Sequence, residues 1–165
     1  MNADAPRSIW ILSREFGKRI VDSARGDLKF RERMHGYYRD WNVGERDMEA
    51  KAGLLLALGL HSLALDRKAE TAGDLAEVPA ADVVSAVHTR PPQELFVSLP
   101  DLDEKDSAAV AQLKLVLLAP ASNMRPSDVA NHHARLVSSA LNYLDNAVRK
   151  TAAGNLTCAD VLGSV

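Results

Sequence analysis

The five histidines are the residues of this chain with the widest chemistry, because imidazole can ligate a metal ion or transfer a proton near neutral pH. A metal site in a helical protein needs ligands that converge from facing helices, or that lie three or four residues apart on one helix. Adjacent His132 and His133 would point about 100° apart on a helix, so they do not readily share one ion. The full set is His35, His61, His88, His132 and His133.

The best metal site that these residues allow places His61 on one core helix and His133 on another. Asp128 or Asp66 would supply a third ligand. A single histidine on an apolar stripe is, however, more often a core residue that is hydrogen-bonded to a neighbour. A metal-dependent helical-bundle enzyme is therefore our second alternative, and we predict no cofactor.

Catalytic motifs of other kinds are missing from the sequence. The lone Cys158 has no flanking nucleophile motif, and a free cysteine usually behaves as a small buried apolar residue. No GxSxG, P-loop or GxGxxG pattern occurs, so acyl hydrolysis and nucleotide binding gain no support. The sequence identifies no catalytic residue, and we predict a protein that is not an enzyme.

A cluster of basic residues near the N-terminus is the strongest indication of nucleic-acid binding. Arginine suits phosphate groups, and the neighbouring Tyr37, Tyr38 and Trp41 could stack on unpaired bases. Acidic residues are interleaved at helical spacing, so the cluster also fits an ordinary solvated face of paired charges. The candidate residues for binding nucleic acid or an acidic partner are Arg14, Lys18, Arg19, Arg25, Lys29, Arg31, Arg33 and Arg39.

The charge of the chain is distributed unevenly. Residues 7–39 hold nine Lys or Arg and four Asp or Glu, a net +5, whereas residues 66–106 hold four and ten, a net −6. Residues 73–92 have some features of a helix-turn-helix, but their acidity argues against DNA binding there. Surfaces of opposite charge favour head-to-tail self-association or docking to a charged partner.

The composition predicts an all-α fold. The 165 residues are 47% hydrophobic and rich in Leu and Ala, with isoleucine only at positions 9, 11 and 20. We expect a compact bundle of five or six helices, with little or no sheet, in a single domain over 1–165 whose ends, 1–7 and 155–165, are peripheral.

The expected segments are Ser8 to about Arg25, Phe30 to Trp41, Asp47 to about Ala69, Pro79 to Pro91, Asp101 to Leu118, Ser127 or Asp128 to about Thr151, and a short turn that begins with Thr157 and Asp160. Residues 93–99 fit either a strand or a helical turn.

The most apolar of these helices has seven leucines between Lys51 and Asp66. These two charged residues enclose fourteen positions, fewer than the roughly 20 that cross a bilayer, so we predict a central core helix and no membrane association. The single cysteine and the lack of a secretory signal favour the cytoplasm.

These observations together predict a non-enzymatic binding, adaptor or regulatory protein that acts through protein contacts. Its partner would be another protein or a second copy of the chain. The first alternative is a nucleic-acid-binding helical subunit that uses the basic N-terminal helices.

Overall fold

The fold is all-α over the residues that the computed structural model describes, namely 5–40, 44–118, 128–150 and 152–163. This confirms the predicted all-α bundle. Side chains are described for 6–35, 44–118, 135–150 and 153–163. Six helices have ten or more residues: α1 (Ala5–Arg25), α2 (Leu28–Asp40), α3 (Glu45–Asp66), α5 (Ala80–Thr89), α7 (Glu104–Leu117) and α8 (Asp128–Leu144). The number of helices is higher than predicted because the single turns α4 (Ala72–Leu75) and α6 (Pro92–Leu95) are also helical, in addition to the predicted short turn α9 (Cys158–Leu162).

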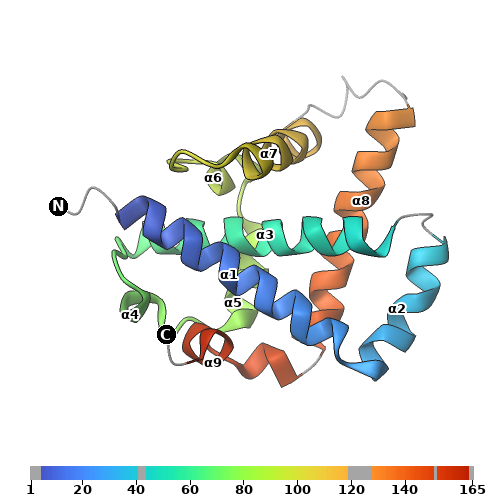
Figure 1. The fold of residues 1–165 in the computed structure, drawn as a ribbon, viewed down its shortest axis with the longest axis horizontal. Coiled ribbons are helices and arrows are strands. Elements are labelled where there is room, and N and C mark those ends of the chain that lie inside the picture. The colour runs from blue at the N-terminus through green and yellow to red at the C-terminus, as the bar shows by residue number, and fades with distance from the viewer. Residues whose placement is uncertain (1–4, 41–43, 119–127, 151, 164–165) are drawn as a thin grey trace.

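Helix α3 is the centre of the bundle. Helix α1 crosses one side of it, α7 lies on the side away from α5 and α9, and α2 and α4 lie near its opposite ends (Figure 1). By length and composition alone, α3 is long and apolar enough to cross a membrane, but 83% of its apolar window is buried inside the protein. Burial on nearly every side makes it a core helix without an amphipathic stripe.

Two glycines bring other helices close to α3. Gly17 of α1 lies against the main chain of Gly53, where an added Cβ atom would be 2.2 Å from the Gly53 carbonyl oxygen. A Cβ on Gly59 would lie 2.7 Å from Val87 Cγ2 and 3.0 Å from the Val83 carbonyl oxygen in α5. Glycine therefore permits the close approach of other helices on two sides of α3.

Local signals placed some helix ends well and others poorly. Gly26 and Asp27 separate α1 from α2, and the Asp27 carboxylate accepts the Phe30 N–H at 3.1 Å. Ser8 and Asp47 do not cap their helices: α1 already includes Ala5, and α3 follows Gly44, so both side chains stand inside the first turns. The preference of Ser and Asp for the position just before a helix is a local effect. It does not indicate whether the helix extends further toward its N-terminus.

Two residues of the segment 155–165, which was predicted to be peripheral, reach the core. Cys158 and Leu162 of α9 are buried, and the predicted turn begins with a capping box formed by Thr157 and Asp160. The Cys158 N–H donates to the Val78 carbonyl oxygen at 2.8 Å, and Pro79 and Thr157 form the isolated β-bridge of the described residues. The undecided segment 93–99 begins within the helical turn α6 and contains no strand.

Candidate functional site

Three of the eight basic residues that were predicted to bind a partner instead form hydrogen bonds or ion pairs within the molecule. Arg14 donates to the Asp106 carboxylate at 3.2 Å. Arg19 donates to Glu15 at 2.9 Å and to the Leu162 carbonyl oxygen at 2.8 Å. Arg25 forms an ion pair with the buried Glu49 on α3. These guanidinium groups hold the bundle together, which reduces the basic surface of α1.

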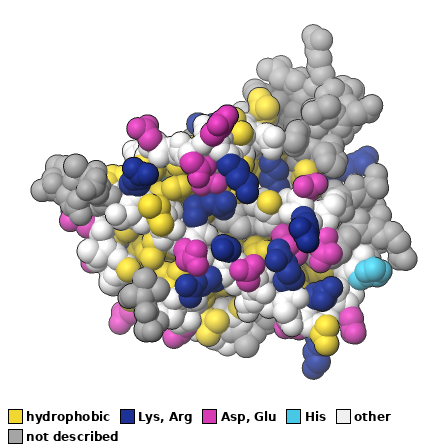
Figure 2. Space-filling model, in the orientation of Figure 1, with side chains coloured by type: hydrophobic (Ala, Val, Ile, Leu, Met, Phe, Trp, Pro, Cys, Tyr) yellow, Lys and Arg dark blue, Asp and Glu magenta, His cyan; other side chains and the backbone are white. Residues whose placement is uncertain are grey.

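The remaining described members of the set are exposed, and no ion pair joins them to other described side chains. They are Lys18 on α1 and Lys29, Arg31 and Arg33 on α2. The side chains of Arg39, Tyr37, Tyr38 and Trp41 lie outside the described residues. Basic and acidic side chains are interleaved along α1 on the face shown in Figure 2.

A shallow groove of about 290 Å³ on α2 brings Arg31 together with acidic residues. Glu32 and His35 have the Glu-x-x-His spacing of some metal-binding helices, a pattern that our sequence reasoning overlooked, and Glu45 lines the same groove. No three metal-ligating side chains of the described part of the chain converge there or elsewhere.

His61 is enclosed in the core and makes an edge-on contact with the Trp10 ring, with 5.8 Å between the ring centroids. Its Nδ1 atom is buried and has no hydrogen-bond partner among the described residues. Burial lowers the pKa of His61, which keeps the ring neutral near pH 7. The side chain of the other predicted ligand, His133, lies outside the described residues, so their pairing remains a prediction.

A larger groove, of about 530 Å³, lies between α1 and the loop that leads into α7. Asp106 is buried at its base, where its Oδ2 atom accepts from Trp10 Nε1 at 3.4 Å and from Arg14 Nε at 3.2 Å. Ile11 is 59% exposed at the side of the groove, which is a large exposure for an apolar residue. The other lining residues are Arg7, Glu15, Lys18, Asp101, Leu102, Asp103 and Lys105.

Local structure fixes the acidic side of this groove. The Asp103 carboxylate caps α7 by accepting the Asp106 N–H at 2.7 Å, which places Asp106 in the first turn of the helix. The sequence indicated this acidic run as a helix start but did not identify Asp106 or Trp10 as partners. These two residues are 96 positions apart, so no local pattern could have connected them.

Lys51 is a second buried polar group that the sequence did not indicate. Its side chain leaves α3, and Nζ donates to the Gln112 amide oxygen on α7 at 2.7 Å. Only 8% of the residue is exposed, and burial lowers its pKa. The contact joins α3 to α7, but the lysine ammonium group loses hydration there, which costs free energy.

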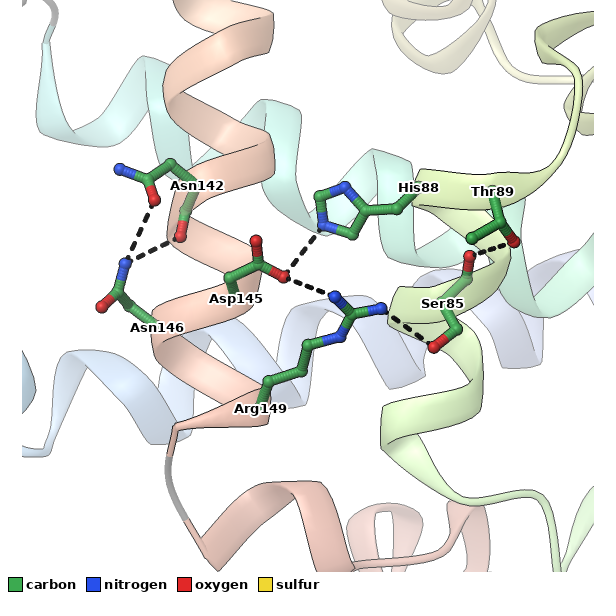
Figure 3. A network of polar contacts seen from close by, with 7 residues as sticks. All are labelled: Ser85, His88, Thr89, Asn142, Asp145, Asn146 and Arg149. Carbon is green, nitrogen blue, oxygen red and sulfur yellow. Dashed lines mark hydrogen bonds and ion pairs between the residues drawn. The ribbon is translucent and has the colours of Figure 1, made fainter.

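A polar network links α5 to the π-helical turn Asp145–Arg149 (Figure 3). Asp145 Oδ1 lies 3.1 Å from His88 Nε2 and 3.3 Å from Arg149 Nη1, while Arg149 Nη2 donates to Ser85 Oγ at 2.9 Å. Ser85 therefore contacts a guanidinium, not the imidazole that would have to accept its proton in a serine nucleophile site. The network therefore joins the π-helical turn to α5.

Cys158 has the properties of a core residue. It is 1% exposed, and burial raises its pKa to about 12. A thiol in this state is a poor nucleophile, since the thiolate is the reactive form.

Comparisons of the chain with protein-family models, with curated proteins and with solved structures find no match.

Proposed function

We propose that this protein is a non-enzymatic adaptor or regulatory protein that binds another protein through the groove between α1 and α7. The observation that carries the proposal is Ile11, which is 59% exposed in a groove whose other lining side chains are largely charged. Protein interfaces combine apolar contacts of this kind with a polar rim. The single buried cysteine is compatible with a cytoplasmic setting, which we also propose.

Crosslinking from the groove tests this function directly. In an Ile11→Cys variant, the new thiol is exposed while Cys158 stays protected, so a photoreactive benzophenone can be attached at position 11 alone. We expect a discrete adduct in an extract of the native cells, with a lower yield when Lys18→Glu is added. Leu28→Cys, 70% exposed on α2, is the matched control. An adduct at position 28 with none at position 11 would contradict the proposal.

Nucleic-acid binding by α2 is the second candidate, because Lys29, Arg31 and Arg33 are exposed without ion pairs to described side chains. Such binding to a fluorescent oligonucleotide should weaken steeply as salt is added. It should also be lost in Arg31→Glu/Arg33→Glu and retained in Arg19→Glu, whose side chain is occupied within the bundle. Absence of binding at low salt would remove this candidate.

A metal-dependent enzyme is the third candidate and depends on His61 and His133. Metal content measured on the purified chain tests it, since a stoichiometric ion should be lost in His61→Ala and in His133→Ala. A metal-free protein that melts at the same temperature with and without a chelator would exclude this site.

A further inference from the structure

The two walls of the groove between α1 and α7 carry charges of opposite sign. The α1 wall has Arg7, Arg14 and Lys18 against one acidic residue, Glu15. The opposite wall has three aspartates and one lysine: Asp101, Asp103, Asp106 and Lys105. The groove as a whole is therefore neutral while each of its walls is charged.

Only part of this charge is neutralised within one molecule. Arg14 is paired with Asp106 at the base, and Glu15 is paired with Arg19. Arg7 and Lys18 on the basic wall, and Asp101 and Asp103 on the acidic wall, are exposed, and among the described side chains no ion pair joins them. One side of the groove thus has cations without ion-pair partners among the described side chains. The other side has two such carboxylates and one such cation, Lys105.

A surface with this distribution is complementary to itself. In a dimer with two-fold symmetry, the same patch is used by both copies, and each contact between two different residues occurs twice. A second copy turned by half a revolution places its acidic wall against the basic wall of the first, and its basic wall against the acidic one. The exposed Ile11 of each copy then lies within the shared interface, where its apolar surface leaves water.

We propose that the occupant of this groove is a second copy of the chain, which forms a symmetric dimer. This inference rests on the proposed protein-binding function and names its partner. Because Ile11 is the one apolar side chain lining the described groove that is more than half exposed, we expect the dimer to be weak and to dissociate as salt screens the charged walls.

A charge exchange tests the dimer in the full-length chain. Sedimentation equilibrium measures the dimer dissociation constant of the wild type, Lys18→Glu, Asp101→Lys and the double variant. We expect each single variant to weaken the dimer by about tenfold or more, and the double variant to return to within about threefold of the wild type. Arg33→Glu and Glu77→Lys, which make the same changes of charge at exposed sites on other elements, should leave the dimer unchanged.

Several results would overturn the proposal. One is a wild-type chain that stays monomeric up to several hundred micromolar at low salt. Another is a double variant as weak as the single variants, and a third is equal weakening by the control variants.

The crosslink at position 11 distinguishes this failure from failure of the proposed function. An adduct with twice the mass of the chain supports the dimer. If the chain is monomeric and its adduct contains a different protein, the dimer is refuted and the protein-binding function is retained. If no adduct forms at position 11, both proposals are wrong.

Discussion

Gly17 of α1 and Gly53 of α3 are in main-chain contact where the two helices cross, yet the contact is asymmetric. A Cβ atom on Gly17 would meet the Gly53 carbonyl oxygen at 2.2 Å, whereas a Cβ on Gly53 would meet its nearest neighbour, Val21 Cγ2, at 3.7 Å. The first distance is a severe clash with main chain, and the second is an ordinary van der Waals contact.

This asymmetry predicts opposite effects for two chemically identical substitutions. Gly17→Ala should lower the free energy of unfolding by about 1–3 kcal/mol, because α1 must move away from α3. Gly53→Ala should leave stability unchanged or raise it by up to about 1 kcal/mol, since alanine favours helix. Both sites are helical, so the gain in propensity is common to the pair. Urea unfolding measures the difference, and two variants of equal stability would refute the predicted crossing.

Asp106 should contribute far more to stability than an exposed carboxylate. Asp106→Ala removes the acceptor of Trp10 and Arg14 at a buried position, which we expect to cost about 2 kcal/mol. Glu15→Ala breaks the exposed pair with Arg19 and should cost less than about 0.5 kcal/mol. Both variants lose one carboxylate, so net charge is matched. Unfolding at low protein concentration separates this effect from dimerisation, and similar losses in the two variants would contradict it.

His61 should make the protein less stable in acid. Burial lowers its pKa below the ordinary value of 6.5, so the unfolded chain binds a proton that the folded chain resists. Stability contributed at this site is therefore lost as the pH falls below 6.5 toward the pKa of the folded state. Between about pH 7.5 and about pH 5, wild type should lose more unfolding free energy than His61→Phe, which retains a ring beside Trp10.

A control for this pH effect is His35→Phe, because His35 is exposed on α2. That variant should follow the wild-type pH dependence. If the curves of wild type and His61→Phe ran parallel, His61 would have to be accessible to protons in the folded protein.

Lys51 should destabilise the fold at neutral pH. Its ammonium group is buried and donates to a neutral amide, so Lys51→Met should raise the free energy of unfolding by about 1 kcal/mol or more. Burial lowers the lysine pKa below the ordinary 10.5, so the penalty is full below the folded-state pKa and is relieved as the pH rises toward 10.5. The advantage of the variant should therefore shrink at alkaline pH.

The exposed Lys29 provides the comparison, since Lys29→Met removes the same charge from a solvated position. Urea unfolding of both variants across neutral and alkaline pH isolates the effect of burial. A loss of stability in Lys51→Met would show that the bond to Gln112 outweighs the cost of burying the charge.

The sequence by itself determined the helices and the identity of the central one. Stripes such as Ile9, Phe16 and Ile20 repeat at the helical period, and glycine or proline marks several ends, because both effects act within a few residues of the chain. The seven leucines of α3 likewise predicted a helix buried on nearly every side. Of the one-turn helices, α9 was predicted from Thr157 and Asp160. Helix α6 begins one residue before a segment, 93–99, that local pattern left open between strand and helical turn, since a single turn leaves no repeat in the sequence.

The groove was decided by tertiary structure alone. Arg14 and Lys18 are one helical turn apart and have the same local pattern, but Arg14 is paired with Asp106 while Lys18 is exposed. The sequence could name both as basic candidates and could not separate them. Which one is paired depends on how α1 is rotated and how closely Gly17 and Gly53 let it approach α3, and these are properties of packing between residues that are far apart along the chain.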